Sequence, residues 1–133
     1  MSDQARVPIS SDSDIVMARQ QGRALAAQLG LSSTNQALVA TAISELARNI
    51  LEYAGYGEII LELVQQGGRR GIVVIARDQG PGIPDIEKAM QDGFSTTNSL
   101  GLGLPGARRL MDDFEIVSQV GKGTTVTVKK WAR

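Results

Sequence analysis

Two long stretches in the first half of the chain repeat their apolar residues at the three- and four-residue spacing of amphipathic helices. The first covers residues 11–29 and the second residues 33–53, and each is followed closely by a glycine, Gly30 or Gly55, that can end a helix. The positions that carry the spacing are Ile15, Ala18, Leu25 and Leu29 in the first stretch and Val39, Ile43, Leu46, Ala47, Ile50 and Ala54 in the second. We therefore predict two helices, each with one buried face.

Short apolar runs elsewhere predict five strands, bounded by glycine-containing turns. The runs are residues 5–9, 58–64, 71–77, 114–120 and 124–131. The second and third runs are joined by QQGGRR and the last two by GKG, so two hairpins are expected. This order of elements favours an α+β two-layer sandwich, with helices on one face of a mixed, mostly antiparallel sheet.

A glycine- and proline-rich segment, residues 78–106, separates the two hairpins. One short helix is expected around Asp85–Gln91, and a third main helix over about residues 104–112. Pro81 and Pro84 do not fit inside a strand or a helix, so residues 79–84 are expected to form a loop.

The amino-acid composition excludes several kinds of chemistry but does not by itself identify the function. The chain has 133 residues, which suits a single domain over residues 1–133, and its 14 basic and 14 acidic residues cancel. No basic excess is available to drive binding to nucleic acid or to a membrane surface. The absence of cysteine and histidine excludes disulfides, thiolate nucleophiles and a phosphohistidine on this chain. No apolar run suits a signal peptide or a membrane span, so a cytoplasmic location is expected.

The first glycine loop, DQGPGIPD at residues 78–85, follows a predicted strand. Gly80 and Gly82 bracket a proline, so the backbone can turn sharply and approach a flat ligand. Asp78 ends the strand, where its carboxylate can accept a hydrogen bond from an amino group. Taken alone, the loop is more typical of an ordinary turn than of a binding site.

The second glycine loop, GLGLPG at residues 101–106, opens a predicted helix. Exposed backbone N–H groups and the positive end of a helix dipole make such a loop suitable for phosphate binding. A dinucleotide-binding fold is excluded, because a polar segment rather than a strand precedes the loop and no acidic residue follows at the required spacing. The phosphate loop of the Walker type is excluded as well, because its glycine-lysine pattern is missing.

Four short motifs occur together in one order along the chain. They are Glu45 with Asn49, Asp78-Gly80-Gly82, Gly101-Gly103-Gly106 and Gly121-Gly123-Thr124. This series resembles the GHKL superfamily of ATP-binding proteins, whose Bergerat fold is shared by gyrase, the heat-shock chaperones of the ninety class, histidine kinases and mismatch-repair ATPases.

Nearly the whole chain is similar to the small serine/threonine kinases of bacterial partner-switching systems. The likeness is greatest to stressosome switch kinases of the RsbT type, through SELARNI, DQGPGIPD, DGFST followed by GLGLPG, and RRLMD. Arg48, directly before the motif asparagine, distinguishes the chain from the sister anti-sigma-factor kinases.

The resemblance implies a role for each motif residue. Glu45 would be the catalytic general base that accepts the proton of a serine hydroxyl, and Asn49 would bind Mg²⁺ with its side-chain oxygen. Asp78 would bind the amino group of adenine, supported by Thr124 through water or directly, and Gly82 would lie against the adenine ring. Glu45 and Asn49 are four positions apart, which places them on the same helix face.

The resemblance also implies further ATP-binding residues in both glycine loops. These are Gly80 and Ile83 in the first loop and Gly101, Leu102, Gly103 and Leu104 in the second. Residues 84–100 would form a short lid over the nucleotide. The resemblance assigns no definite role to two charged residues of the second helix. Glu52 is expected on a solvated face. Arg48 could brace Glu45, touch phosphate or face a protein substrate.

By resemblance, the chain is expected to be a Mg-ATP-dependent protein serine/threonine kinase. Its implied substrates are STAS-domain antagonist and scaffold proteins, and its further partner, once it is released, is a PP2C-type phosphatase in stress signalling. Two alternatives remain open at this point. One is a nucleotide-gated anti-sigma-type binding module with little phosphotransfer, and the other is a catalytic domain that acts on a separate phosphohistidine carrier.

Overall fold

The computed structural model describes residues 4–83, 90 and 103–132 of the chain. The elements in chain order are β1 (Gln4–Ile9), α1 (Asp12–Leu29), α2 (Ser33–Tyr53), β2 (Gly57–Gln66), β3 (Arg69–Asp78), α4 (Gly103–Leu110), β4 (Asp113–Gln119) and β5 (Gly123–Trp131). Each predicted strand and each of the three main helices is therefore present. The expected short helix around Asp85–Gln91 lies outside the described residues, apart from Met90.

The five strands form one sheet in the order β1-β2-β3-β5-β4. All four pairings between neighbouring strands are antiparallel, so the mixed character expected of the sheet is wrong for the described residues. The physical reason lies in the connections. β2–β3 and β4–β5 are hairpins, and α1 and α2 together return the chain so that β2 runs against β1.

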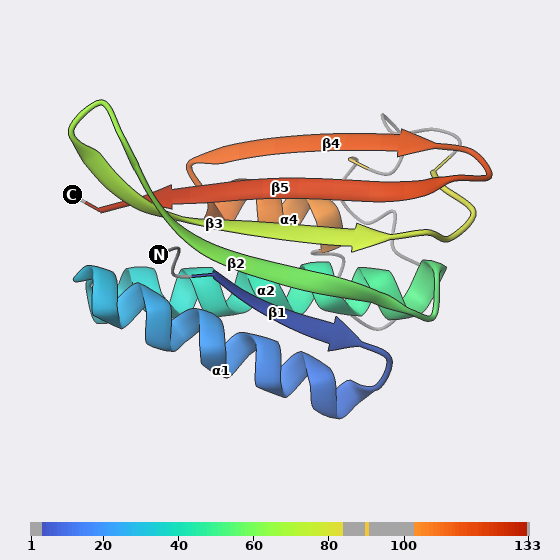
Figure 1. The fold of residues 1–133 in the computed structure, drawn as a ribbon, viewed down its shortest axis with the longest axis horizontal. Helices are drawn as coiled ribbons and strands as arrows, with labels where there is room; N and C mark the ends of the chain where they lie inside the picture. The colour runs from blue at the N-terminus through green and yellow to red at the C-terminus, as the bar shows by residue number, and fades with distance from the viewer. Residues whose placement is uncertain (1–3, 84–89, 91–102, 133) are drawn as a thin grey trace.

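The helices lie on one face of this sheet, and in the described part of the chain the other face carries no helix (Figure 1). The core between the layers is made by alternate strand residues and by the buried faces of α1 and α2, which confirms the predicted two-layer α+β arrangement. Its largest fully buried side chains are Val7, Ile9, Val39, Ile43, Leu46, Ile59, Leu61, Ile72, Val74 and Val128.

The helix ends follow local sequence signals. Gly30 closes α1 in the left-handed conformation, with φ of 94°, as its position after the last apolar residue predicts. The hydroxyl of Ser32 accepts a hydrogen bond from the backbone N–H of Asn35 and so caps α2. At the start of α1, the backbone N–H of Ser10 donates to the carboxylate of Asp14 and lowers the pKa of that group.

No helix in the described ranges is both long enough and apolar enough to cross a membrane. The fold instead brings the end of α2, the end of β3 and the turn between β4 and β5 to one end of the molecule (Figure 1). The residues of the predicted motifs that the structure describes lie on these segments, in the middle of α2 and at the start of α4.

Candidate functional site

Glu45 lies in the middle of α2 and is buried, with 7% of its side chain exposed. One Nη atom of Arg48, a turn further along the helix, donates a hydrogen bond of 2.8 Å to its Oε1. Arg48 itself is 43% exposed, so the guanidinium connects a buried carboxylate with solvent. Of the three roles open to Arg48 from the sequence, the structure bears out the bracing of Glu45.

Asn49 follows on the same face of α2 and is half-buried. Its side-chain amide has no hydrogen-bond partner among the described residues. An amide oxygen in this position is free to bind a cation or a ligand. Glu45 and Asn49 therefore keep the relative placement that their four-residue spacing predicts.

Glu52 differs from its expected place on a solvated face. Its side chain is half-buried, and its Oε1 is withdrawn from solvent. Burial, and then the charge of Glu52, raise the pKa of the neighbouring Tyr53 hydroxyl. One oxygen of the Glu52 carboxylate is therefore buried, while the side chain as a whole is only partly withdrawn from solvent.

Asp78 is the last residue of β3 and is half-buried. Its Oδ1 accepts a hydrogen bond of 2.9 Å from the backbone N–H of Gly80, which turns the chain sharply after the strand. Its Oδ2 has no partner among the described residues. This second oxygen is the one that remains for an amino group.

The chain after β3 packs directly onto the end of α2. A β-carbon on Gly80 would lie 2.6 Å from Cβ of Ala54, a separation that real side chains do not reach. A β-carbon on Gly57 would likewise lie 2.7 Å from Ile50 Cγ2 and 3.2 Å from Asp78 Cβ. Two glycines thus allow the Asp78 turn to lie beside the helix that carries Asn49.

The loop over residues 79–83 is attached to the β4–β5 hairpin. The backbone N–H of Gly121 donates to the carbonyl of Pro81 at 2.8 Å, and the backbone N–H of Ile83 donates to Ser118 Oγ at 2.7 Å. Ile83 is half-buried and packs against the hydrophobic core. Because its N–H is already bonded, Ile83 is left to contact a ligand through its side chain or carbonyl.

Gly82 and Gly123 sit where two backbones meet. With φ of 79°, Gly82 points its Cα hydrogen at the carbonyl of Gln119, and a β-carbon there would overlap that oxygen. Gly123, with φ of 121°, stands in the same relation to the carbonyl of Asp78. Gly82 and Gly123 belong to separate motifs. Each must be a glycine because it contacts the backbone of the segment that carries the other. The predicted contact of Gly82 with a ligand ring stays a prediction.

Thr124 pairs with Asp78 across the β3–β5 ladder and is 7% exposed. Its hydroxyl forms a 2.7 Å hydrogen bond with the hydroxyl of Ser118 and none directly with Asp78. Ser118 was missed by the motif comparison, although one signal exists in the sequence. It is the polar member of the inward-facing series Phe114, Ile116, Ser118 on β4.

The second glycine loop is described only from Gly103 onward, and the predicted residues Gly101 and Leu102 lie outside the described residues. Gly103 begins α4 with φ of 40°, so its N–H belongs to the open end of that helix. Leu104 is 4% exposed and belongs to the core, which leaves only its backbone for a ligand. Arg108 and Arg109 are exposed in the last turn of α4, where positive side chains interact favourably with the helix dipole.

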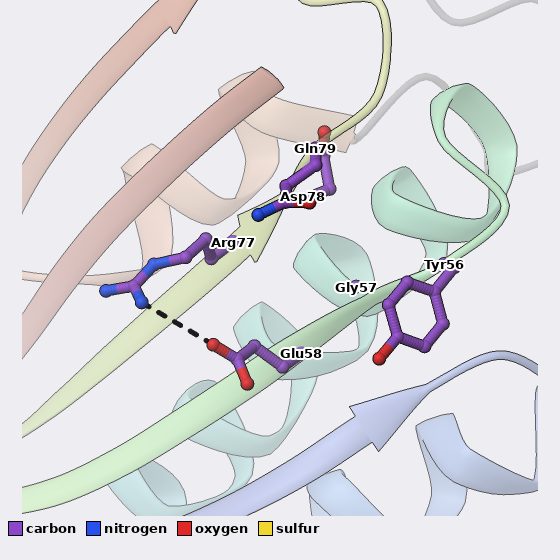
Figure 2. A pocket seen from close by; sticks show the side chains of 6 residues that line it. All are labelled: Tyr56, Gly57, Glu58, Arg77, Asp78 and Gln79. Atoms are coloured by element: carbon purple, nitrogen blue, oxygen red, sulfur yellow. Dashed lines mark ion pairs between the residues drawn. The ribbon is translucent and has the colours of Figure 1, made fainter. Parts of the chain in front are cut away.

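A pocket of about 200 Å³ adjoins Asp78 where β2 begins and β3 ends (Figure 2). Its wall includes the exposed Tyr56 and an ion pair of 3.6 Å between Arg77 and Glu58. This volume is below the roughly 300 Å³ at which ligand pockets usually begin. The pocket is therefore a recess beside the predicted nucleotide site rather than a complete site.

The described residues contain no cluster of three or more carboxylate, histidine or cysteine side chains that could hold a metal ion. Magnesium nevertheless fits the donor present, because it takes one or two protein oxygens and completes its shell with phosphates and water. The side-chain oxygen of Asn49 supplies one such ligand. A cation at this position would thus depend on a bound polyphosphate.

Comparison with known proteins assigns most of the chain to one type of domain. Residues 10–130 match the histidine kinase-like ATPase domain. Over 133 residues the chain is 55% identical to the serine/threonine-protein kinase RsbT of Bacillus subtilis (strain 168), and the match covers 100% of both chains. It is 36% identical over 130 residues to the anti-sigma F factor of Thermoanaerobacter sp. (strain X514), covering 92% of this chain and 89% of the relative.

A solved structure shares the fold at lower identity. The RsbU and RsbW domains of a Mycobacterium tuberculosis protein match with a TM-score of 0.63 and 22% identity. The match covers 98% of this chain but 33% of the other, so the chain spans about a third of that longer protein. At this identity the likeness supports the fold alone.

Proposed function

The chain belongs to the family of histidine kinase-like ATPase domains, and on that premise we propose that it is a cytoplasmic, Mg-ATP-dependent protein serine/threonine kinase. Its proposed substrates are STAS-domain antagonist and scaffold proteins of a partner-switching pathway. Phosphorylation of these proteins releases the kinase, which then activates a PP2C-type phosphatase in stress signalling.

The observation that carries the proposal is the pairing of a buried carboxylate and an available amide on one face of α2. Glu45 is held by Arg48, and Asn49 follows at helical spacing without a partner among the described residues. A helix that served packing alone would have no need of a charge at a buried position, because burying an ion is costly. The 55% identity to a serine/threonine-protein kinase over the full length supports the same reading.

Phosphotransfer assigns a distinct part to each group. The acceptor hydroxyl gives its proton to Glu45 while its oxygen forms a bond to the γ-phosphorus of ATP. The bond from that phosphorus to the bridging oxygen breaks, and its electron pair leaves with ADP. The products are the phosphoserine or phosphothreonine, ADP and a protonated Glu45, which returns its proton to solvent.

The nucleotide is oriented by groups at the other end of the site. Asp78 Oδ2 accepts from the adenine amino group, while the loop over residues 79–83 is kept in place by the β4–β5 hairpin. The N-terminal end of α4, beginning at Gly103, faces negative charge favourably because of its helix dipole. Magnesium, bound through Asn49, would neutralise charge on the phosphates.

The relatives also include anti-sigma F factors, which favours a second candidate of another class. In that reading, the chain is a nucleotide-gated binding module that holds a partner protein and transfers little phosphate. A binding module needs Asp78 and Asn49 for its nucleotide. It has no use for a carboxylate held in the position of Glu45.

The test is transfer from γ-labelled ATP, with Mg²⁺, to a STAS-domain protein from the same genome, followed by mapping of the modified residue. The proposal predicts label on a serine or threonine of that protein. ATP-dependent complex formation without label would favour the binding module instead. Label on a histidine would identify a phosphohistidine carrier as the true substrate.

A further inference from the structure

Arg48 of α2 contacts Glu45, but it has no part of its own in the proposed kinase reaction. We propose that Arg48 is a positioning residue for phosphotransfer, holding Oε1 of Glu45 so that Oε2 is left to receive the proton of the acceptor hydroxyl. This inference rests on the proposed function and adds to it a residue that acts through the base.

The contact geometry supports this role. The 2.8 Å distance from Arg48 Nη to Glu45 Oε1 is that of a charge-assisted hydrogen bond, and no other hydrogen bond to the Glu45 carboxylate occurs in the described part of the chain. A single donor on one oxygen restrains the position of that oxygen. It leaves the second oxygen available, which a general base requires.

The two ends of the ion pair differ in exposure. Glu45 is 7% exposed and Arg48 is 43% exposed, so the carboxylate is buried and its counter-charge faces solvent. A buried carboxylate without a counter-charge is unstable as an ion. The exposed guanidinium therefore gives the buried carboxylate a partner and holds its Oε1 from the solvent side of the helix.

Helix geometry also separates this role from binding of Mg-ATP. Arg48 and Asn49 are consecutive residues of α2, so their side chains leave the helix about 100° apart. Arg48 is directed to Glu45, three residues before it, whereas Asn49 makes no such contact. Loss of Arg48 is therefore expected to slow transfer without weakening nucleotide binding.

The experiment compares Arg48→Ala, Arg48→Gln and Arg48→Lys with the wild type in single-turnover phosphotransfer, with ATP affinity measured in parallel. Arg48→Ala and Arg48→Gln should lose about 10- to 100-fold in rate at unchanged ATP affinity, because a misplaced reacting group costs rates of that order. Arg48→Lys should recover part of the loss. Arg70→Ala, which removes an exposed guanidinium at the far end of β3, should behave as the wild type.

The same substitutions are repeated in a Glu45→Gln background, and thermal unfolding is measured for each protein without nucleotide. If Arg48 acts through Glu45, Arg48→Ala should cause little further loss of rate in the Glu45→Gln background. It should also lower the melting temperature less in that background than in the protein with native Glu45. A normal rate for Arg48→Ala, equal effects in both backgrounds, or a loss confined to ATP affinity would overturn the inference. A wild type that transfers no phosphate would instead overturn the proposed kinase function itself.

Discussion

The hydroxyls of Ser118 and Thr124 lie 2.7 Å apart beside the turn of the β4–β5 hairpin, and Ser118 Oγ also accepts a hydrogen bond from the backbone N–H of Ile83. Ser118 thus joins the late glycine-threonine motif to the loop that follows Asp78. Two motifs separated by some forty residues of sequence are thus joined through a hydroxyl that belongs to neither, in addition to the hydrogen bond from Gly121 N–H to the carbonyl of Pro81. The loop after β3 and the turn of the β4–β5 hairpin are therefore connected by hydrogen bonds at the end of the molecule where we propose that the nucleotide binds.

The first prediction concerns this hydroxyl. Ser118→Ala leaves the N–H of Ile83 without its acceptor, and a polar group that loses its partner in a partly buried site costs about 1–3 kcal/mol. We expect ATP affinity, measured by calorimetry, to fall about 10-fold. Ser33→Ala, on the exposed first turn of α2, is the matched control. Unchanged affinity for Ser118→Ala would show that the loop keeps its position without the hydroxyl.

The second prediction separates the two oxygens of Asp78. Asp78→Asn retains an oxygen that can accept the N–H of Gly80, but it replaces the other oxygen with a donor. We expect the melting temperature without nucleotide to stay close to that of the wild type. ATP affinity should fall about 10- to 100-fold, as for a lost hydrogen bond to a charged group. A large loss of thermal stability at unchanged affinity would make Asp78 a turn residue only.

The third prediction concerns the cation. Asn49→Ala removes the available amide oxygen of α2. The variant should therefore bind ATP no more tightly in the presence of Mg²⁺ than in the presence of a chelator that removes Mg²⁺. The wild type should bind ATP more tightly when Mg²⁺ is present. Glu45→Gln is the control, because it keeps Asn49 and should retain the Mg²⁺ dependence. Equal Mg-ATP affinity in the wild type and Asn49→Ala would contradict the magnesium assignment.

The fourth prediction distinguishes backbone strain from close contact at two glycines. Gly121 has φ of 84° and open space around it, so Gly121→Ala should lower the free energy of unfolding by about 1–2 kcal/mol from strain alone. Gly82→Ala adds overlap with the carbonyl of Gln119 and should cost about 1–3 kcal/mol more. Urea unfolding of both variants measures the difference. If both variants lost the same free energy of unfolding, the loop that carries Gly82 would be able to move away from the β4–β5 hairpin without loss of stability.

Much of the fold was predictable because helices and strands leave periodic patterns. The buried faces of α1 and α2, both hairpins and the stop at Gly30 agree with the structure. The all-antiparallel sheet was not predicted, because the direction of a strand depends on its connections rather than on its residues. Glu52 was placed on the solvated side because its charge was considered without the packing around the end of α2.

Motifs in the sequence propose candidate site residues, but they do not reveal contacts between distant segments. Glu45, Asn49 and Asp78 were proposed as site residues from the family motifs that they match, and their roles stay predictions. Ser118 was not, because a serine in a strand carries no motif, and its importance comes from meeting Ile83 across the fold. The reason for Gly82 was also hidden, since a contact with Gln119 leaves no trace in the local sequence.

The most direct test of the central claim is the rate of single-turnover phosphotransfer to a STAS-domain protein by the wild type and by Glu45→Gln, each saturated with Mg-ATP. The account predicts label on serine or threonine with the wild type, and a loss of about 10²- to 10⁴-fold with Glu45→Gln at unchanged ATP affinity. Equal rates for the two proteins would contradict the assignment of Glu45 as the base. Absence of transfer from the wild type would contradict the kinase itself.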